Sequence, residues 1–225
     1  MMLDKKTNYL QVALNNTLGE AAAVIDCLPV DKRIILEAGT PLIKSYGKNG
    51  IKFIVEQWRD RAFGAGIFPY VVADMKCQDR GAMEVGIAKK SGASAITVNG
   101  AAPIETINVL IQECEKAGLD SMIDMMNVEQ PFKTLRKLKK LPDVVMLHRG
   151  VDEETFNKEK PIPYLQINKI RANQDVLIAV AGGDTIREVQ RAIFNDANIA
   201  VVWKEFYKSS DQTALLAEEF LKSVK

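Results

Sequence analysis

An apolar run breaks directly into charged residues in the stretch Val71-Val72-Ala73-Asp74-Met75-Lys76-Cys77-Gln78-Asp79. The run from Tyr70 to Ala73 predicts a strand that is buried on both faces. Side chains alternate between the two faces of an extended backbone, so we expect Asp74 and Lys76 to point to the same side. Buried charges are costly unless they are paired or bind a metal ion. The pair is therefore either an ion pair that closes a strand end or part of a functional site.

Strand-like and helix-like segments alternate along the whole chain. We expect strands at residues 10–14, 33–36, 70–73, 95–98, 121–123, 144–147, 176–180 and 199–202. We expect helices from Thr17, whose spacing to Glu20 predicts a capping box, and over 51–63, 79–90, 103–118, 132–140, a short segment before 176, 184–194 and 211–224. Eight such units without a linker predict a single (β/α)₈ barrel domain over residues 1–225. The alternative is an open doubly wound sheet, which usually has fewer units and a glycine-rich first turn.

Composition excludes several classes of protein. Lys plus Arg number 30 against 29 Asp plus Glu. The chain therefore lacks the excess of basic residues that would suggest binding to nucleic acid. No apolar run reaches membrane-spanning length and the start of the sequence does not resemble a signal peptide, so we expect a cytoplasmic protein. The three cysteines are widely spaced and are expected to be reduced thiols. The single histidine excludes a zinc site built from several histidines.

Polar and ionisable residues gather at the predicted strand ends. In a barrel the carboxyl ends of all strands meet at one mouth, where active sites lie. The residues expected there are Asn15, Glu37, Asp74 with Lys76, Thr97, Asp124, His148, Gly182 with Gly183, and Trp203 with Lys204. The strand starts do not show such a cluster in the sequence, so a functional site at the mouth is favoured over scattered surface charge.

Individual roles follow from chemistry. Glu37 and Asp74 fall on adjacent predicted strands and are suitable ligands for Mg²⁺, which keeps several water ligands. A salt bridge to Lys76 is the alternative role for Glu37. Lys76, between Asp74 and Asp79, is expected to stay charged and to stabilise an oxyanion.

His148 is a candidate general base, because imidazole titrates near neutral pH and Asp152 follows closely in the sequence. A lone histidine is also often structural. Gly182 and Gly183 precede a predicted helix and offer backbone N–H groups to a phosphate. The polar segment 149–161 is long enough to suggest a loop that acts as a lid.

These residues resemble the orotidine 5′-monophosphate decarboxylase superfamily, whose signature Asp-x-Lys-x-x-Asp stands here at Asp74, Lys76 and Asp79. Within it, the chain is similar to the 3-hexulose-6-phosphate synthases and the 3-keto-L-gulonate-6-phosphate decarboxylases. The supporting motifs are Leu10-Gln-Val-Ala-Leu14, Glu37-Ala-Gly-Thr-Pro-Leu-Ile-Lys44, Ala73-Asp-Met-Lys76, Val98-Asn-Gly-Ala-Ala102, His148-Arg-Gly-Val-Asp152 and Val180-Ala-Gly-Gly183.

The resemblance implies an aldol addition of formaldehyde to D-ribulose 5-phosphate, or its reverse, through an enediolate. It implies His148 as the base, Lys76 beside the enediolate, and Mg²⁺ on Glu37 and Asp74. It also implies a homodimer in which Asp79 comes from the partner subunit. The substrate contacts that it implies are Asn15, Thr40, Asp124, Val151, Gly182, Gly183 and Lys204.

A few positions separate the candidate functions. Asp124, Val151 and Ala181 stand where the keto-gulonate decarboxylases tend to have Glu, Arg and Thr, so they favour a synthase. Asn15 stands where the family has Asp, and Trp203 stands where the family has glycine. These two motivate the alternatives, which are a superfamily enzyme with a changed substrate or decarboxylase activity, and a barrel that has lost catalysis and serves in binding or regulation.

Overall fold

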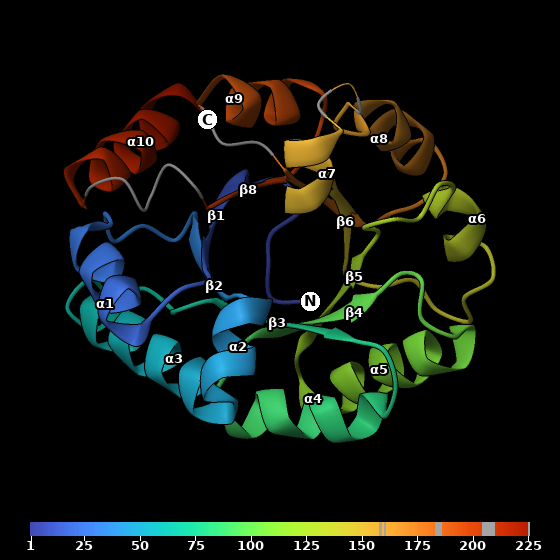
Figure 1. Ribbon diagram of the computed structural model, residues 1–225, viewed down its shortest axis with the longest axis horizontal. Helices are drawn as coiled ribbons and strands as arrows, with labels where there is room; N and C mark the ends of the chain where they lie inside the picture. The colour runs from blue at the N-terminus through green and yellow to red at the C-terminus, as the bar shows by residue number, and fades with distance from the viewer. Residues whose placement is uncertain (158, 160, 183–185, 204–209, 225) are drawn as a thin grey trace.

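Eight parallel strands close into a barrel in the computed structural model, which describes residues 1–157, 159, 161–182, 186–203 and 210–224 (Figure 1). Each strand pairs with its neighbours in chain order, and β8 pairs back onto β1. The strands are β1 Tyr9–Leu14, β2 Ile34–Ala38, β3 Val71–Cys77, β4 Ala95–Asn99, β5 Asp120–Asp124, β6 Val144–His148, β7 Leu177–Ala181 and β8 Ile199–Val202. This arrangement confirms the predicted (β/α)₈ barrel and excludes the open sheet.

Most of the helices form a ring around the outside of the barrel, and two short helices, α2 (Thr40–Tyr46) and α7 (Val151–Phe156), lie inside this ring in the view of Figure 1. The helices are α1 Leu18–Cys27, α2 Thr40–Tyr46, α3 Lys48–Phe63, α4 Gly81–Lys90, α5 Ile104–Ala117, α6 Pro131–Leu135, α7 Val151–Phe156, α8 Tyr164–Arg171, α9 Ile186–Phe194 and α10 Ser210–Ser223. The predicted capping box is present at the start of α1, where Thr17 and Glu20 bond to each other's backbone N–H groups. None of the described helices is both long enough and apolar enough to cross a membrane.

Two apolar clusters form because side chains alternate along each strand. One set of strand residues packs outward against the helices and makes the larger cluster, with Leu36 and Ile123 among its fully buried members. The other set fills the barrel and includes Ile35, Val72 and Met122. The inward positions therefore run with period two along each strand and continue to the mouth.

Two segments differ from the sequence predictions. Residues 149–161 are not a simple loop, because they contain α7, whose Glu153 side chain accepts a hydrogen bond from the backbone N–H of Gly150. This helix buries none of its residues, so no apolar periodicity announces it. The helix expected over 132–140 ends at Leu135. The residues that follow form a like-charged run, which disfavours a helix, and the N–H of Lys139 bonds to Asn108 instead.

A buried polar cluster also lies at the opposite end of the barrel, contrary to the expectation for the strand starts. Asp120, the first residue of β5, is almost fully buried. Its carboxylate accepts a hydrogen bond from the Tyr70 hydroxyl at 2.9 Å and from the backbone N–H of Met2 at 2.8 Å. Leu3 then packs into the inner apolar cluster. Buried ionisable residues with hydrogen-bond partners therefore occur at both ends of the barrel. The mouth differs from the opposite end in the kinds of side chain that it brings together.

Candidate active site

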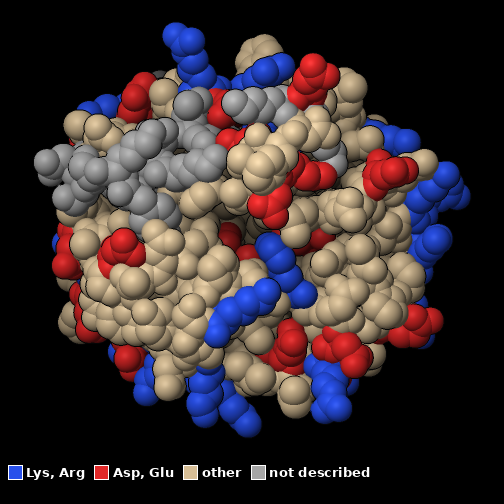
Figure 2. All heavy atoms as spheres, viewed as in Figure 1, with Lys and Arg blue, Asp and Glu red and all other residues tan. Residues whose placement is uncertain are grey.

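The mouth of the barrel is polar because the inward positions change character there. Each of four strands places a polar residue two positions after an inward apolar one: Glu37 follows Ile35, Asp74 follows Val72, Thr97 follows Ala95, and Asp124 follows Met122. All four of these polar residues are buried. Figure 2 shows the face on which α2 and α7 lie, and both acidic and basic side chains are visible near its centre.

The end of β3 is bulged, and this bulge aims Lys76 into the mouth. The pairing of β3 with β4 shifts between Ala73 and Cys77, and Lys76 has a φ of 44°, in the left-handed region. Asp74 and Lys76 do meet, as predicted, but a regular extended backbone is not the reason. The Thr97 hydroxyl accepts a hydrogen bond from the Lys76 N–H and donates to Asp74 Oδ1, both at 2.8 Å.

The ammonium of Lys76 lies between two carboxylates. Its Nζ is 2.8 Å from Asp74 Oδ2 and 2.7 Å from Asp124 Oδ2. Burial disfavours the charged form, but the two carboxylates outweigh it and raise the pKa of Lys76 well above its usual range. The second partner within the chain is therefore Asp124 rather than Asp79, which is exposed. Lys76 is a fixed positive charge at neutral pH.

His148 pairs with the same carboxylate of Asp124. The His148 Nδ1 lies 2.9 Å from Asp124 Oδ2, and the Asp124 side chain is only 1% exposed. Burial alone lowers the pKa of His148, but the Asp124 carboxylate outweighs burial and raises it. Burial likewise raises the pKa of Asp124, and His148 and Lys76 together bring it far below its usual range. The prediction that Asp152 lies beside His148 is wrong, because Asp152 is exposed on α7.

Glu37 is held from below by a residue that the sequence analysis missed. The side-chain amide of Gln11, which is fully buried, donates a hydrogen bond to Glu37 Oε2. Burial and the Asp74 carboxylate raise the pKa of Glu37 to about 7. Lys76 instead pairs with the two aspartates, so the alternative salt bridge to Glu37 is not formed. A polar residue at an inward position of an otherwise apolar strand was the available signal for Gln11.

The carboxylates fit a magnesium site with few protein ligands. Among the described residues, no three His, Cys, Asp or Glu side chains cluster as a metal site. Glu37 and Asp74 are the two carboxylates that could hold Mg²⁺, an ion that usually has few protein ligands and keeps several waters. Burial and then the Asp74 carboxylate disfavour the charged form of Glu37 and raise its pKa, and a divalent cation held by both carboxylates would favour the charged form. The Thr40 hydroxyl donates to Asp74 Oδ2 at 2.7 Å, so it orients one ligand.

Of the remaining predicted substrate contacts, Asn15 follows the end of β1 and Val151 follows the end of β6. The Asn15 side chain fills the space beside Gly39, where any larger residue would collide with it. Val151 is exposed at the start of α7. Trp203 is partly buried against the inner apolar cluster. Gly183 and Lys204 lie outside the described residues.

Gly182 occupies a backbone conformation that favours glycine. Its φ is +106°, and a Cβ there would lie 2.6 Å from the carbonyl oxygen of Arg149. The turn after β7 is therefore packed closely against the end of β6, although sequence analysis associated it only with phosphate.

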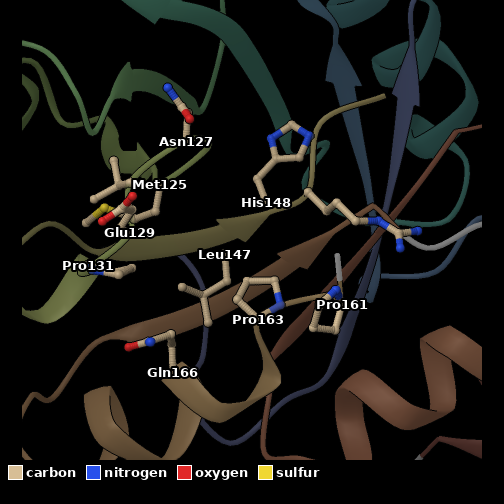
Figure 3. A pocket seen from close by; sticks show the side chains of 11 residues that line it. Met125, Asn127, Glu129, Pro131, Leu147, His148, Pro161, Pro163 and Gln166 are labelled. Atoms are coloured by element: carbon tan, nitrogen blue, oxygen red, sulfur yellow. The ribbon is translucent and has the colours of Figure 1, made fainter. Parts of the chain in front are cut away.

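A cavity of about 200 Å³ adjoins His148 (Figure 3). It lies where the ends of β5 and β6 face α6 and α8, and His148, Asn127 and Gln166 are among the residues around it. Arg149 also lines it.

All three cysteines are free, and burial raises the pKa of the Cys77 thiol to about 12, so this thiol is not a nucleophile at neutral pH.

The fold and the site define a (β/α)₈ barrel that joins a lysine, a histidine and buried carboxylates at its mouth. Residues 8–218 match the family described as "Orotidine 5'-phosphate decarboxylase / HUMPS family", and the chain belongs to this family. This confirms the predicted superfamily.

Relatives within the family refine the comparison. The bifunctional enzyme Fae/Hps of Methanocaldococcus jannaschii is 39% identical over 204 residues, which cover 90% of this chain and 49% of the relative. The chain therefore spans about half the length of the curated relatives it matches.

Two crystal structures of 3-hexulose-6-phosphate synthase are similar in fold, each at 26% identity. The first has a TM-score of 0.82 and covers 96% of this chain and 100% of its own. The second, from Salmonella typhimurium, has a TM-score of 0.77 and covers 94% and 99%. These matches confirm the prediction of an enzyme.

Proposed function

We propose that this barrel catalyses the Mg²⁺-dependent aldol addition of formaldehyde to D-ribulose 5-phosphate, or the reverse reaction. One observation carries the proposal: the Asp124 carboxylate contacts both the Lys76 ammonium and the His148 ring. A candidate base and a fixed cation are thereby held around one buried anchor, which suits removal of a proton next to a carbonyl group.

His148 would move the proton. Because Asp124 holds Nδ1, Nε2 would take the proton from C1 of the sugar phosphate. The electrons of that C–H bond would form the C1–C2 double bond of an enediolate, and the π electrons of the C2 carbonyl would move to its oxygen. The C1–C2 π electrons would then form the new bond to the carbon of formaldehyde, and the C2 carbonyl would form again. The electron pair of the aldehyde π bond would move to its oxygen, which would accept the proton from His148.

Lys76 would stabilise the charge that develops on the substrate oxygens. Its ammonium is already positioned by Asp74 and Asp124, so little reorganisation is needed during the reaction. When bound at Glu37 and Asp74, Mg²⁺ supplies further positive charge at the enediolate. The turn at Gly182 is the proposed end of the site for the phosphate group.

We also propose that two copies of the chain associate at the edge of this site. Asp79 is exposed beside a shallow hollow that Arg80, Met83 and Val109 also line. The Met83 and Val109 side chains on α4 and α5 are 55% and 41% exposed and line the same hollow, so they offer an apolar surface that a second copy could cover. Met83→Glu should convert a dimer into a monomer in light scattering, and an unchanged mass would contradict this interface.

A changed substrate, or 3-keto-L-gulonate-6-phosphate decarboxylation, is the second candidate. The partly buried Trp203 favours it, because an indole at the mouth alters the shape of the site. A barrel without catalysis is the third. The buried contacts among Asp74, Lys76, Asp124 and His148 weigh against it. Burying such a charged cluster costs stability, so we would not expect it to be kept in a protein that does not use it.

Formaldehyde consumption with ribulose 5-phosphate, measured with Mg²⁺ and then with EDTA, tests the proposal. Metal-dependent consumption that is lost in a folded Asp74→Ala variant is expected. Unchanged consumption in that variant would rule out this site. A folded wild-type protein that consumes no formaldehyde would favour the second candidate if it releases CO₂ from the keto-gulonate phosphate, and the third if it does not.

A further inference from the structure

We propose that Arg149 is a positioning residue that couples the strand end carrying His148 to the turn at Gly182. The inference rests on the proposed function, in which His148 moves the proton and the Gly182 turn receives the phosphate group. It assigns a role to a buried cation that the reaction itself does not use.

Arg149 contacts the end of β7 twice. Its backbone N–H donates to the carbonyl oxygen of Ala181 at 3.1 Å, and its Nη2 donates to the carbonyl oxygen of Gly182 at 3.0 Å. The side chain is only 12% exposed. A hydrogen bond from a charged donor is stronger than a neutral one, particularly where water is excluded. The position of Gly182 therefore depends on the guanidinium.

The contact with Gly182 also leaves little freedom to the turn. The hydrogen bond from Arg149 Nη2 to the Gly182 carbonyl oxygen restricts how the backbone of Gly182 can rotate. The φ of +106° and the close approach to the Arg149 carbonyl oxygen prevent a side chain from replacing this packing. Arg149 thus presents the turn to a ligand in one arrangement.

A second contact joins Arg149 to the helix at the rim. Its Nη2 lies 3.8 Å from Glu154 Oε1 on α7, and α7 buries none of its residues. The guanidinium of Arg149 therefore contacts both the Glu154 carboxylate on α7 and the Gly182 carbonyl oxygen after β7. The planar guanidinium holds its donors in a fixed geometry, whereas a lysine ammonium is a compact charge on a flexible stem.

The neighbouring residue makes this arrangement relevant to catalysis. His148 directly precedes Arg149, and its ring is fixed on the other side of the strand by Asp124. A displacement of the Gly182 turn therefore reaches the base through one residue. We infer that Arg149 fixes the position of the Gly182 turn, where the phosphate group would bind, relative to His148, which would transfer the proton.

The test compares Arg149→Met with Arg171→Met. Arg171 is a matched control because it also donates to backbone carbonyls, those of Val176 and Asp196, but at the opposite end of the barrel. In Arg149→Met we expect the KM for ribulose 5-phosphate and the Kd for inorganic phosphate, measured by calorimetry, to rise about tenfold, with a smaller change in kcat. In Arg171→Met we expect a lower Tm and unchanged KM and Kd.

The outcomes separate the inference from the proposed function. If a folded Arg149→Met binds phosphate like the wild type, the inference is overturned even though formaldehyde is consumed. If the wild type binds phosphate but consumes no formaldehyde, the proposed reaction fails while the calorimetric comparison still tests Arg149. Absence of phosphate binding to the wild type overturns the inference. Should Arg149→Met not fold, Arg149→Lys replaces it, with a smaller rise in Kd expected and an unchanged Kd contradicting the role.

Discussion

The hydroxyl of Thr97 on β4 accepts a hydrogen bond from the backbone N–H of Lys76 at the end of β3, at 2.8 Å. This bond stabilises a left-handed residue in a bulged strand, where the regular ladder is interrupted. The same hydroxyl donates to Asp74, so one side chain positions both the carboxylate and the lysine. Backbone strain of this kind persists only where the surroundings hold it.

Thr97→Val should disrupt the bulge while preserving the volume of the side chain. It leaves the Lys76 N–H without its partner and removes one of two donors to Asp74 Oδ1, which still accepts from Lys76 Nζ at 3.1 Å. A buried unsatisfied group costs about 1–3 kcal/mol. We expect a loss of about 2 kcal/mol in urea unfolding and a drop in kcat of about tenfold or more. Thr97→Ser retains the hydroxyl and should stay close to the wild type. Wild-type kcat in Thr97→Val would show that the bulge does not position Lys76.

The barrel could be predicted from the sequence because its evidence is local. Each strand is an apolar run and each helix has its own periodicity, so eight alternations suffice. The pairing of His148 with Asp124 could not be found by the same means, because the two residues lie on neighbouring strands. The register places Asp124 opposite Met146, one inward position before His148. Searching the local sequence instead suggested Asp152, which lies on the surface.

The conformation of Lys76 depends on a long-range contact and was likewise beyond local reasoning. An alternating strand predicted the meeting of Asp74 and Lys76, and the side chains do meet. The bulge that brings this about is held by Thr97, 21 residues further along the chain. No feature of 71–79 alone distinguishes a bulged strand end from a regular one.

The pH dependence of the proposed reaction should reflect His148. A base must be neutral to take a proton, and the Asp124 carboxylate raises the pKa of His148 above its ordinary value. We therefore expect kcat/KM to rise with pH through a midpoint above about 6.5. Asp124→Asn should lower both this midpoint and kcat, because it removes the charge beside His148 and a partner of Lys76. An unchanged midpoint would mean that another group is titrating.

The same pair should influence stability with the opposite trend. Since the folded-state pKa of His148 is raised, its contribution to stability is fully present below the unfolded value and is lost as the pH rises through the folded value. Urea unfolding of the wild type and of His148→Gln should therefore differ more at pH 6 than at pH 9. Equal differences at the two pH values would contradict the charged pairing with Asp124.

Gln11 should affect metal binding without contacting the metal. Its amide orients Glu37 from inside the barrel, and groups that orient a ligand typically change metal affinity by about tenfold or more. We expect Gln11→Met to weaken binding of Mn²⁺, used as a probe for Mg²⁺ and measured by electron paramagnetic resonance, by about that factor. Gln112→Met, on the exposed side of α5, is the control and should bind normally. Unaltered Mn²⁺ binding in Gln11→Met would show that Glu37 does not need this support or is not a ligand.

Tyr70→Phe should separate stability from activity. The Tyr70 hydroxyl bonds to Asp120 at the end of the barrel opposite the mouth, and burial together with Asp120 raises the pKa of Tyr70. Removing the hydroxyl leaves Asp120 with the N–H of Met2, so we expect a loss of about 1–2 kcal/mol in urea unfolding. The KM and kcat should not change, because no hydrogen bond or ion pair among the described residues links Tyr70 or Asp120 to Lys76 or His148. A fall in kcat in the folded variant would mean that the base of the barrel influences the mouth, and the separation of the two ends would then be wrong.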